Sequence, residues 1–258
     1  MGFYVFVRGC LRLLINSLNI DTGMIPKIIH YCWFGGKPLP ENVKKYISTW
    51  TKYLPGFKIK QWDESNFDVN ALQYTRQAYF AGKYAFVSDV ARLYALMNEG
   101  GLYLDTDILI KKPFPEEWFA LDAFGSFEHD VYVQTGIIAC VAHHPLISAF
   151  YDTYQKRAFF HGLKFDITTN VSVFTKLMAE YGFEMNDTEQ TINGFTVFPQ
   201  KYLCANDWLN GRYDDDDTFA VHDFRGSWGK DVLKSVISYR FKSAMTVAKW
   251  KIRELMNK

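Results

Sequence analysis

Two aspartates stand one residue apart in an otherwise apolar run, GGLYLDTDILI, at residues 100–110. Residues two apart in an extended chain point to the same side, so Asp105 and Asp107 are expected to face one spot at the end of a buried strand. Two like charges this close repel each other, and a hard divalent cation relieves the repulsion. The pattern predicts a metal site that can also take a diphosphate. Alternatively, one aspartate caps a turn and the other pairs with a surface lysine.

The segment before this pair, residues 88–101, has the apolar period of a helix that ends at two glycines. Ser88 is expected to cap its first turn. Asp89 and Arg92 lie three residues apart on one side of its apolar stripe. They either form a local ion pair or bind sugar hydroxyls and a phosphate. Trp33, at the end of an earlier strand-like segment, can stack on a nucleobase or pack in the core.

Strand-like and helix-like segments alternate along the chain, without an internal repeat or a low-complexity linker. The alternation predicts a single layered α/β domain with a mainly parallel central sheet flanked by helices. The expected strands are 25–33, 57–62, 123–128, 131–141 and 195–198, and the expected helices are 41–54, 70–82, 88–101, 145–158 and 170–181.

Composition limits the classes of partner. The chain has 258 residues, is 48% hydrophobic, and has 29 Lys and Arg against 28 Asp and Glu. It can bury a large core, and it lacks the overall positive field that duplex DNA binding calls for, so we expect no nucleic-acid partner. The cysteines are scattered and form no C-x-x-C pair, which favours buried thiols in a reducing compartment over a zinc site. They are Cys10, Cys32, Cys140 and Cys204.

Both ends of the chain differ from the middle. Residues 1–23 are mostly apolar with two arginines, too short and interrupted to cross a membrane and without a cleavage site, so an interfacial helix or an extension before the domain is expected there. Residues 230–258 predict a basic amphipathic helix that either attaches to an anionic membrane surface or packs on the domain. We expect a cytoplasmic protein, with attachment to the inner face of the membrane through this helix, and a domain over 24–229.

Four segments together resemble glycosyltransferase family 32: IPKIIHYCWFGGKPLP from residue 25, WDESNFD at 62–68, FVSDVARLYALMNEGGLYLDTDI at 86–108, and HDFRGSW at 222–228. The family includes capsular polysaccharide enzymes and is distantly similar to the catalytic domains of clostridial glucosylating toxins. The resemblance implies a GT-A fold, a nucleotide-sugar donor, a divalent metal and retention of anomeric configuration. It also implies a glycan or lipid-linked glycan acceptor in surface polysaccharide synthesis, or a protein acceptor if the chain is toxin-like.

The resemblance also assigns residues to the donor. Trp33 is expected to stack on the base, and Tyr103 to line the donor pocket. Ribose and sugar are expected to be held by Ser88, Asp89 and Arg92.

A second set is assigned to the metal and the leaving group. Asp107 is expected to bind the metal directly, and Asp105 to bind sugar or ribose hydroxyls and, through water, the metal. His222 is expected as a late ligand of the metal or the diphosphate, or else as a hydrogen-bonded core histidine. Because histidine nitrogen suits manganese better than magnesium, Mn(II) is expected. Ser227 is expected beside the diphosphate, and Trp228 to donate its indole N–H to the departing phosphate oxygen.

Other polar segments are assigned less directly. FEHDVYVQTG at 127–136 and ITTN at 167–170 are expected to border the acceptor, with Gln134 and Asn170 as candidates. A run of four aspartates at 214–217 predicts a solvated loop, because consecutive carboxylates cannot all converge on one ion.

A rival interpretation is a haloacid dehalogenase-like phosphohydrolase, which also carries a D-x-D after an apolar strand. Those motifs have Thr or Val where this chain has Leu109, and they lie near the start of their domain. A non-catalytic sugar-nucleotide or membrane-binding module is a third possibility, and metal-dependent turnover of a nucleotide sugar would exclude it.

Overall fold

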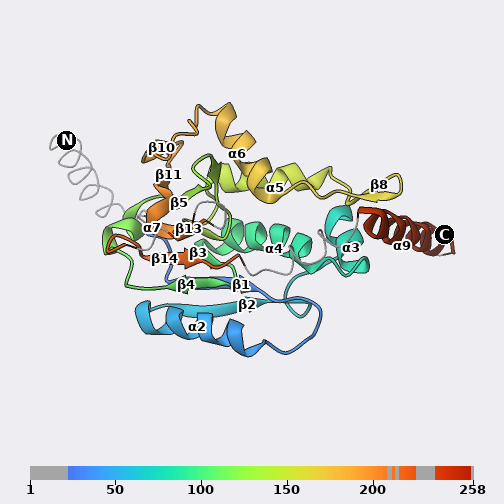
Figure 1. Cartoon of the computed structure of the whole chain (residues 1–258), viewed down its shortest axis with the longest axis horizontal. Helices are drawn as coiled ribbons and strands as arrows, with labels where there is room; N and C mark the ends of the chain where they lie inside the picture. The colour runs from blue at the N-terminus through green and yellow to red at the C-terminus, as the bar shows by residue number, and fades with distance from the viewer. Residues whose placement is uncertain (1–22, 208–210, 213–214, 225–235, 257–258) are drawn as a thin grey trace.

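A computed structural model describes residues 23–207, 211–212, 215–224 and 236–256 (Figure 1). The helices are α2 (Glu41–Tyr53), α3 (Gln73–Phe80), α4 (Tyr84–Glu99), η1 (Glu116–Ala120), α5 (Pro145–Gln155), α6 (Asn170–Glu180), α7 (Gln200–Leu203) and α9 (Val236–Met256). The strands are β1 (Ile28–Cys32), β2 (Lys58–Trp62), β3 (Gly101–Leu104), β4 (Ile108–Ile110), β5 (Ala123–Glu128), β6 (Tyr132–Val133), β7 (Ile137–Cys140), β8 (Phe160–His161), β9 (Lys164–Phe165), β10 (Gln190–Ile192), β11 (Phe195–Phe198), β12 (Asn206–Asp207), β13 (Gly211–Arg212) and β14 (Ala220–His222).

The central sheet has the strand order β10-β11-β5-β7-β3-β1-β2, and β6 pairs with β5. Strands β2, β1, β3, β5 and β11 all run in one direction, while β7 runs antiparallel between β3 and β5. The expected α/β architecture with a mainly parallel sheet is therefore confirmed. Since parallel strands end at the same edge, the residues that follow β1, β3 and β5 are brought together.

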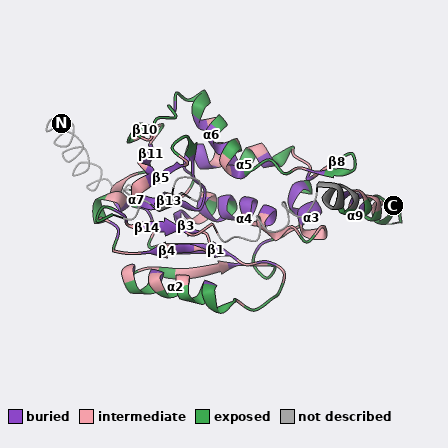
Figure 2. Cartoon of the chain, viewed as in Figure 1, coloured by how far each residue is buried: buried purple, intermediate pink, exposed green. Residues whose placement is uncertain are grey.

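Alternation along the strands divides the core between the two faces of the sheet. On β3, Leu102 and Leu104 pack in the hydrophobic cluster that contains Trp50 of α2. Tyr103 points the other way, into the cluster that contains Leu93 of α4. The buried strands and the exposed outer side of α2 can be followed in Figure 2. Fully burying such side chains contributes about 1.5–3 kcal/mol each, so the strand ends rest on a firmly packed base.

Two predicted elements were wrong in detail. The helix expected to begin at Ser88 begins at Tyr84, and Ser88 lies inside it with its hydroxyl donating to the Tyr84 carbonyl at 3.1 Å instead of capping the first turn. The single strand expected over 131–141 is two short strands, β6 and β7, separated by residues 134–136. A polar turn that contains Gly136 interrupts the apolar pattern there, and this turn borders the site described below.

Helix α9 packs across one end of the domain. The Trp250 ring lies 5.0 Å from that of Phe80 and 5.7 Å from that of Phe160. None of the helices in the described part of the chain combines the length and the apolar composition that a membrane span requires. The three described cysteines, Cys32, Cys140 and Cys204, are buried and form no disulfide. Apart from Gly23, the predicted extension 1–23 lies outside the described residues.

Candidate active site

A cavity of about 780 Å³ opens at the carboxyl edge of the sheet. Trp33 comes directly after β1, Asp105 directly after β3, and Glu128 is the last residue of β5. Eight of the ten predicted site residues line this cavity: Trp33, Ser88, Asp89, Arg92, Tyr103, Asp105, Asp107 and His222. The other two, Ser227 and Trp228, lie outside the described residues.

The two aspartates converge for a different reason from the one expected. Residues 105–107 form a turn between β3 and β4, in which the Ile108 N–H donates to the Asp105 carbonyl at 3.1 Å. Strand β4 then leaves the central sheet and pairs with β14. The premise of one extended chain across Asp105 and Asp107 was therefore wrong. The turn, not strand alternation, gathers their carboxylates.

His222 reaches the aspartates through the pairing of β14 with β4. In this antiparallel register His222 lies opposite Ile108, one residue after Asp107. Its Nε2 is 3.2 Å from Asp107 Oδ1. One ligand atom from each of Asp105, Asp107 and His222 lies within 4.8 Å of the other two. Two carboxylates and an imidazole at this spacing fit a divalent cation such as Mn(II) or Mg(II).

Electrostatics tie Asp107 to His222. Burial opposes ionisation of Asp107, but the neighbouring His222 outweighs it and holds the pKa of Asp107 below its usual value. Burial likewise opposes the charge on His222, yet Asp107 raises the pKa of His222 well above its ordinary value. Metal binding requires the neutral imidazole, so a cation entering this group displaces a proton from it.

Arg92 joins the metal-capable group to helix α4. Its guanidinium lies 3.1 Å from Asp89 and 3.2 Å from Asp105, and it donates to the Thr135 carbonyl at 2.6 Å. The same group lies 4.6 Å from the centre of the Tyr103 ring. Because Arg92 is buried, removing either Arg92 or its carboxylate partner would leave an uncompensated buried charge, at a cost of about 3–5 kcal/mol. The alternative of a weak surface ion pair does not describe this contact.

Asp89 lies behind Arg92. Its side chain is 1% exposed, and its Oδ1 accepts from Asn170 at 2.7 Å as well as from Arg92. Burial raises the pKa of Asp89 to about 7, and the Arg92 charge partly offsets that shift. In this arrangement Asp89 orients Arg92 and Asn170, and its role toward sugar hydroxyls stays a prediction.

Trp33 and Tyr103 are both fixed by hydrogen bonds. The Trp33 indole N–H donates to the Lys37 carbonyl at 2.6 Å, which anchors the ring in the loop after β1. The Tyr103 hydroxyl donates to Asp105 Oδ1 at 2.9 Å, so this residue positions a metal-capable carboxylate and also lines the cavity. The aspartates and the indole at position 33 thus share one cavity.

Several cavity features were not assigned from the sequence. Glu128 lines the cavity although it was noted only within a segment bordering the acceptor. A Cβ on Gly136 would lie 2.9 Å from His222 Cε1 and 3.1 Å from Asp105 Oδ2, so this position has no room for a side chain. Of the two acceptor candidates, Asn170 lines the cavity, whereas Gln134 is buried and donates to Ser126. The signal for Glu128 was its place at a strand end, like that of Asp105.

Comparisons with known proteins find glycosyltransferases among the proteins similar to this chain. Residues 40–125 match the sequence model of the family described as a glycosyltransferase sugar-binding region containing a DXD motif. The chain is 28% identical over 221 residues to an uncharacterized glycosyltransferase, L373, of Acanthamoeba polyphaga mimivirus, covering 80% of this chain and 84% of that protein. It is 29% identical over 127 residues to Subversion of eukaryotic traffic protein A of Legionella pneumophila, covering 39% of this chain and 20% of that protein.

Among solved structures, the PaToxG glycosyltransferase is 20% identical with a TM-score of 0.46, covering 69% of this chain and 78% of that one. The sequence matches carry the assignment. The family segment 40–125 includes both helix α4 and the turn at 105–107, so its DXD motif is the pair of aspartates in the cavity. The chain is a glycosyltransferase by these matches, and its residues 40–125 are similar to the sugar-binding region that contains a DXD motif.

Proposed function

We propose that this glycosyltransferase is metal-dependent, takes a sugar from a nucleotide-sugar donor, and transfers it with retention of configuration to a glycan or lipid-linked glycan acceptor in surface polysaccharide synthesis. One observation carries the proposal. The group formed by Asp105, Asp107 and His222 shares a cavity with an anchored indole, Trp33, and a buried guanidinium, Arg92.

The cavity offers chemistry for each part of such a donor. The Trp33 ring can stack on the base. Asp105, Asp107 and His222 would hold a divalent cation, preferably Mn(II), which when bound stabilises negative charge on a leaving diphosphate. The strand order supports this arrangement, because Trp33 follows β1 and the aspartates follow its neighbour β3.

The protein itself supplies the fixed geometry. Arg92 is held by Asp89 and the Thr135 carbonyl, and it in turn orients Asp105, which also accepts from Tyr103. Groups held in advance need little reorganisation when charge develops in the transition state, which is a major source of catalysis. Retention follows from the family resemblance, and it requires the acceptor hydroxyl to approach from the face of the leaving group.

A donor screen tests the proposal. The protein with Mn(II) is incubated with a panel of nucleotide sugars, and release of nucleoside diphosphate is measured. We expect release from one or a few donors, and no release after chelation of the metal. Anomeric coupling constants of the product then report retention or inversion. Absence of release from every donor would contradict the proposed function.

The acceptor class has two candidates. The resemblance to toxin-like glycosyltransferases adds a protein acceptor beside glycans. Transfer of labelled sugar to a lysate separated into protein, lipid and polysaccharide fractions distinguishes them. Label in the protein fraction alone would contradict the polysaccharide assignment.

We also propose that α9 attaches the enzyme to an anionic membrane surface. Its inward face carries Val247 and Trp250, and Glu254 lies 3.7 Å from Arg76 of the domain. Its exposed apolar side chains are Met245, Ile252, Leu255 and Met256, which are 48–80% exposed. Exposed lysines stand among them: Lys242, Lys249 and Lys251.

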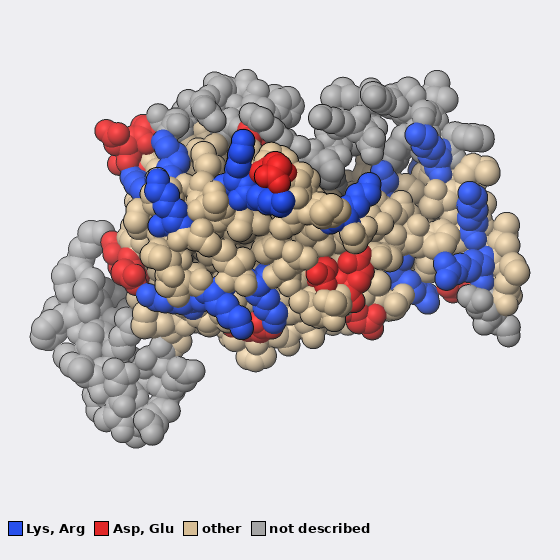
Figure 3. Space-filling view, turned by 90° about the horizontal axis from the view of Figure 1, so that it is seen from below, with Lys and Arg blue, Asp and Glu red and all other residues tan. Residues whose placement is uncertain are grey.

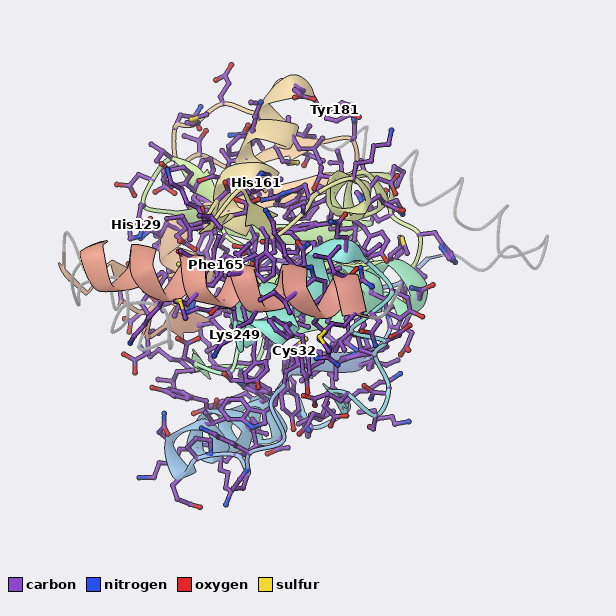
Figure 4. All side chains as sticks on the ribbon, turned by 90° about the vertical axis from the view of Figure 1, so that its right-hand side faces the viewer. Cys32, His129, His161, Phe165, Tyr181 and Lys249 are labelled. Carbon is purple, nitrogen blue, oxygen red and sulfur yellow. The ribbon has the colours of Figure 1, made fainter. Side chains whose placement is uncertain are left out.

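The arrangement of α9 suits contact with a flat surface. Figure 4 shows the helix lying across this end of the molecule, and Figure 3 shows basic side chains gathered at the same end. Exposed apolar groups insert at the headgroup boundary, and each lysine near anionic lipid contributes about 1 kcal/mol. These features match an anionic bilayer in both shape and charge.

Vesicle sedimentation tests this attachment. We expect the protein to sediment with phosphatidylserine-containing vesicles and not with phosphatidylcholine alone. The double variant Lys249→Glu, Lys251→Glu should lose this binding, while Lys176→Glu, an exposed lysine on α6, should keep it. Equal binding by both variants would exclude α9 as the contact.

A further inference from the structure

Glu128 is a buried carboxylate to which the proposed mechanism gives no role. It is 9% exposed, ends β5 and lines the cavity. Among the described residues, no side chain or backbone group forms a hydrogen bond or ion pair with its carboxylate, although almost all buried polar groups have a partner. One of its oxygens lies within 4.8 Å of a ring nitrogen of His222 and of Cys204 Sγ, beyond hydrogen-bond distance of any described partner. A carboxylate that is withdrawn from solvent, faces a cavity and has no hydrogen bond in the described part of the chain is suited to receive a ligand.

The position of Glu128 along the sheet edge indicates which part of the donor it meets. The strand order runs β1, β3, β7, β5, and neighbouring strands are roughly 4.8 Å apart, so β5 lies about 14 Å from β1. A base on Trp33 after β1 and a diphosphate near the aspartates after β3 leave the sugar toward β5. Glu128 therefore lies at the sugar end of the proposed donor.

The chemistry of Glu128 agrees with this position. A carboxylate accepts hydrogen bonds from hydroxyl groups, whereas it repels the oxygens of a phosphate, which carry the same charge. A sugar offers several hydroxyl donors and no charge. Of the donor's parts, the sugar is the one that an ionised Glu128 can bind most favourably.

A stack of rings stands beside Glu128. The Phe224 ring lies 3.9 Å from that of His222 and 5.6 Å from that of His129, with interplanar angles of 25° and 21°. All three residues line the cavity. An aromatic face covers the apolar C–H groups of a sugar while a nearby carboxylate takes its hydroxyls, which is the mixture of apolar wall and few polar groups that small-ligand sites use.

We propose that Glu128 binds the transferred sugar by accepting hydrogen bonds from its hydroxyls, and that it thereby contributes to the choice of sugar. This inference rests on the proposed function, since it assumes a nucleotide-sugar donor in this cavity. It assigns to Glu128 a contact with the sugar and no contact with the diphosphate.

Paired binding measurements test the proposal. The affinities of a nucleotide sugar and of its nucleoside diphosphate, both with Mn(II), are measured by calorimetry for the wild type and Glu128→Gln. We expect nucleotide-sugar binding to weaken about 10-fold, as the loss of a charged hydrogen-bond acceptor predicts. Binding of the diphosphate should change less than about 2-fold. Glu189→Gln, an exposed glutamate, is the matched control and should change neither affinity.

Two further measurements make the outcomes distinct. Thermal unfolding shows whether each variant is folded. If Glu128→Gln does not fold, Glu128→Asp provides a second variant, which keeps the charge on a shorter side chain. Ranking nucleotide sugars that share one base should give a different order in the variants than in the wild type.

Equal weakening for both ligands, or no weakening for either, overturns the role of Glu128 while leaving the proposed function intact. A wild type that binds no nucleotide sugar overturns the proposed function itself.

Discussion

In the described part of the chain two arginines are paired with aspartates, one buried at the cavity and one partly buried outside it. Arg92 lies 3.1 Å from Asp89, and Arg157 lies 2.6 Å from Asp166. Each guanidinium also lies within 5.1 Å of the centre of a tyrosine ring. Pairing and ring contact are thus common to both sites and do not distinguish a functional site from a structural one.

The difference lies in the number of carboxylates around each guanidinium. Among the described residues, Arg157 is paired with one carboxylate, that of Asp166. Arg92 is paired with two, those of Asp89 and Asp105, and Asp107 and Glu128 line the same cavity. Carboxylates gathered in one cavity are suited to bind a cation, and this gathering, more than any single pair, marks the site.

The largest expected effect is that of Asp107→Asn in the cavity. Sugar transfer and donor hydrolysis should fall by at least about 100-fold, because a ligand of the proposed cation, which would stabilise the leaving diphosphate, is lost. The same type of change outside the cavity, Asp166→Asn, should leave turnover within about 2-fold and lower the free energy of unfolding by about 1–3 kcal/mol. Steady-state kinetics and urea unfolding measure both variants. Full activity of Asp107→Asn would remove the distinction between the two sites.

Metal binding should respond to the same contrast. At a Mn(II) concentration of about 100 times Kd, binding to the folded state stabilises it by about 2.7 kcal/mol. We expect Mn(II) to raise the unfolding midpoint of the wild type and of Asp166→Asn, but not of Asp107→Asn. A chelator should reverse the shift. A midpoint that rises equally in all three proteins would place the ion elsewhere.

Replacing each arginine by lysine sharpens the comparison further. Lysine keeps the charge but loses the planar fork that lets Arg92 contact Asp89, Asp105 and the Thr135 carbonyl together. Arg92→Lys should lower kcat/KM by about 30-fold, or roughly 2 kcal/mol. Arg157→Lys should lower the unfolding midpoint while kcat/KM stays near that of the wild type. A loss of kcat/KM in Arg157→Lys but not in Arg92→Lys would contradict the assignment of function to Arg92.

A smaller effect is expected from Gly136→Ala. Its new methyl group would lie 2.9 Å from His222 Cε1 and 3.1 Å from Asp105 Oδ2, so these side chains would have to shift. We expect about a 10-fold loss of kcat/KM, since small displacements at a catalytic group are costly. Gly56→Ala is the matched control, because the nearest atom, on Lys27, is 3.9 Å from the added Cβ. Equal activity in both variants would show that the cavity wall yields.

The smallest effect concerns acid stability at the structural pair. Burial opposes the ionisation of Asp166, but hydrogen bonds from Arg157 and Thr168 outweigh it and hold the pKa of Asp166 below its ordinary value of 3.8. Its contribution to stability is therefore present above the unfolded-state pKa, about 3.9, and is lost as pH falls through the lower folded-state pKa. The stability difference between wild type and Asp166→Asn should shrink in that window, as urea unfolding at several pH values would show.

The sequence predicted the long periodic elements well. The strands at 123–128 and 195–198 and the start of the helix at 41 agree with the structure, because alternation and a proline before the helix are local signals. Helix α4 was placed late because Ser88 was taken as a cap, although an apolar segment precedes it. The strand expected over 131–141 missed the break at 134–136, because few polar residues interrupt the apolar pattern there.

The candidate site was predictable as a set of residues but not as a geometry. The D-x-D motif and the residues of α4 are close in sequence, so their proximity follows from a helix, a turn and a strand. The contact of His222 with Asp107 depends on the pairing of β14 with β4, which no local pattern specifies. Glu128 was missed because a glutamate at a strand end is common, and its unpartnered state becomes visible only in three dimensions.

The pairing of β14 with β4 has a consequence for synthesis of the protein. Ile108 and His222 are joined in one ladder although most of the chain's second half lies between them. A growing polypeptide that has left the ribosome only as far as β11 already carries both aspartates but lacks the imidazole. Such a chain offers two of the three ligands of the proposed metal site. Binding by all three would await β14, and an ion bound there would hold the early and late parts of the chain together.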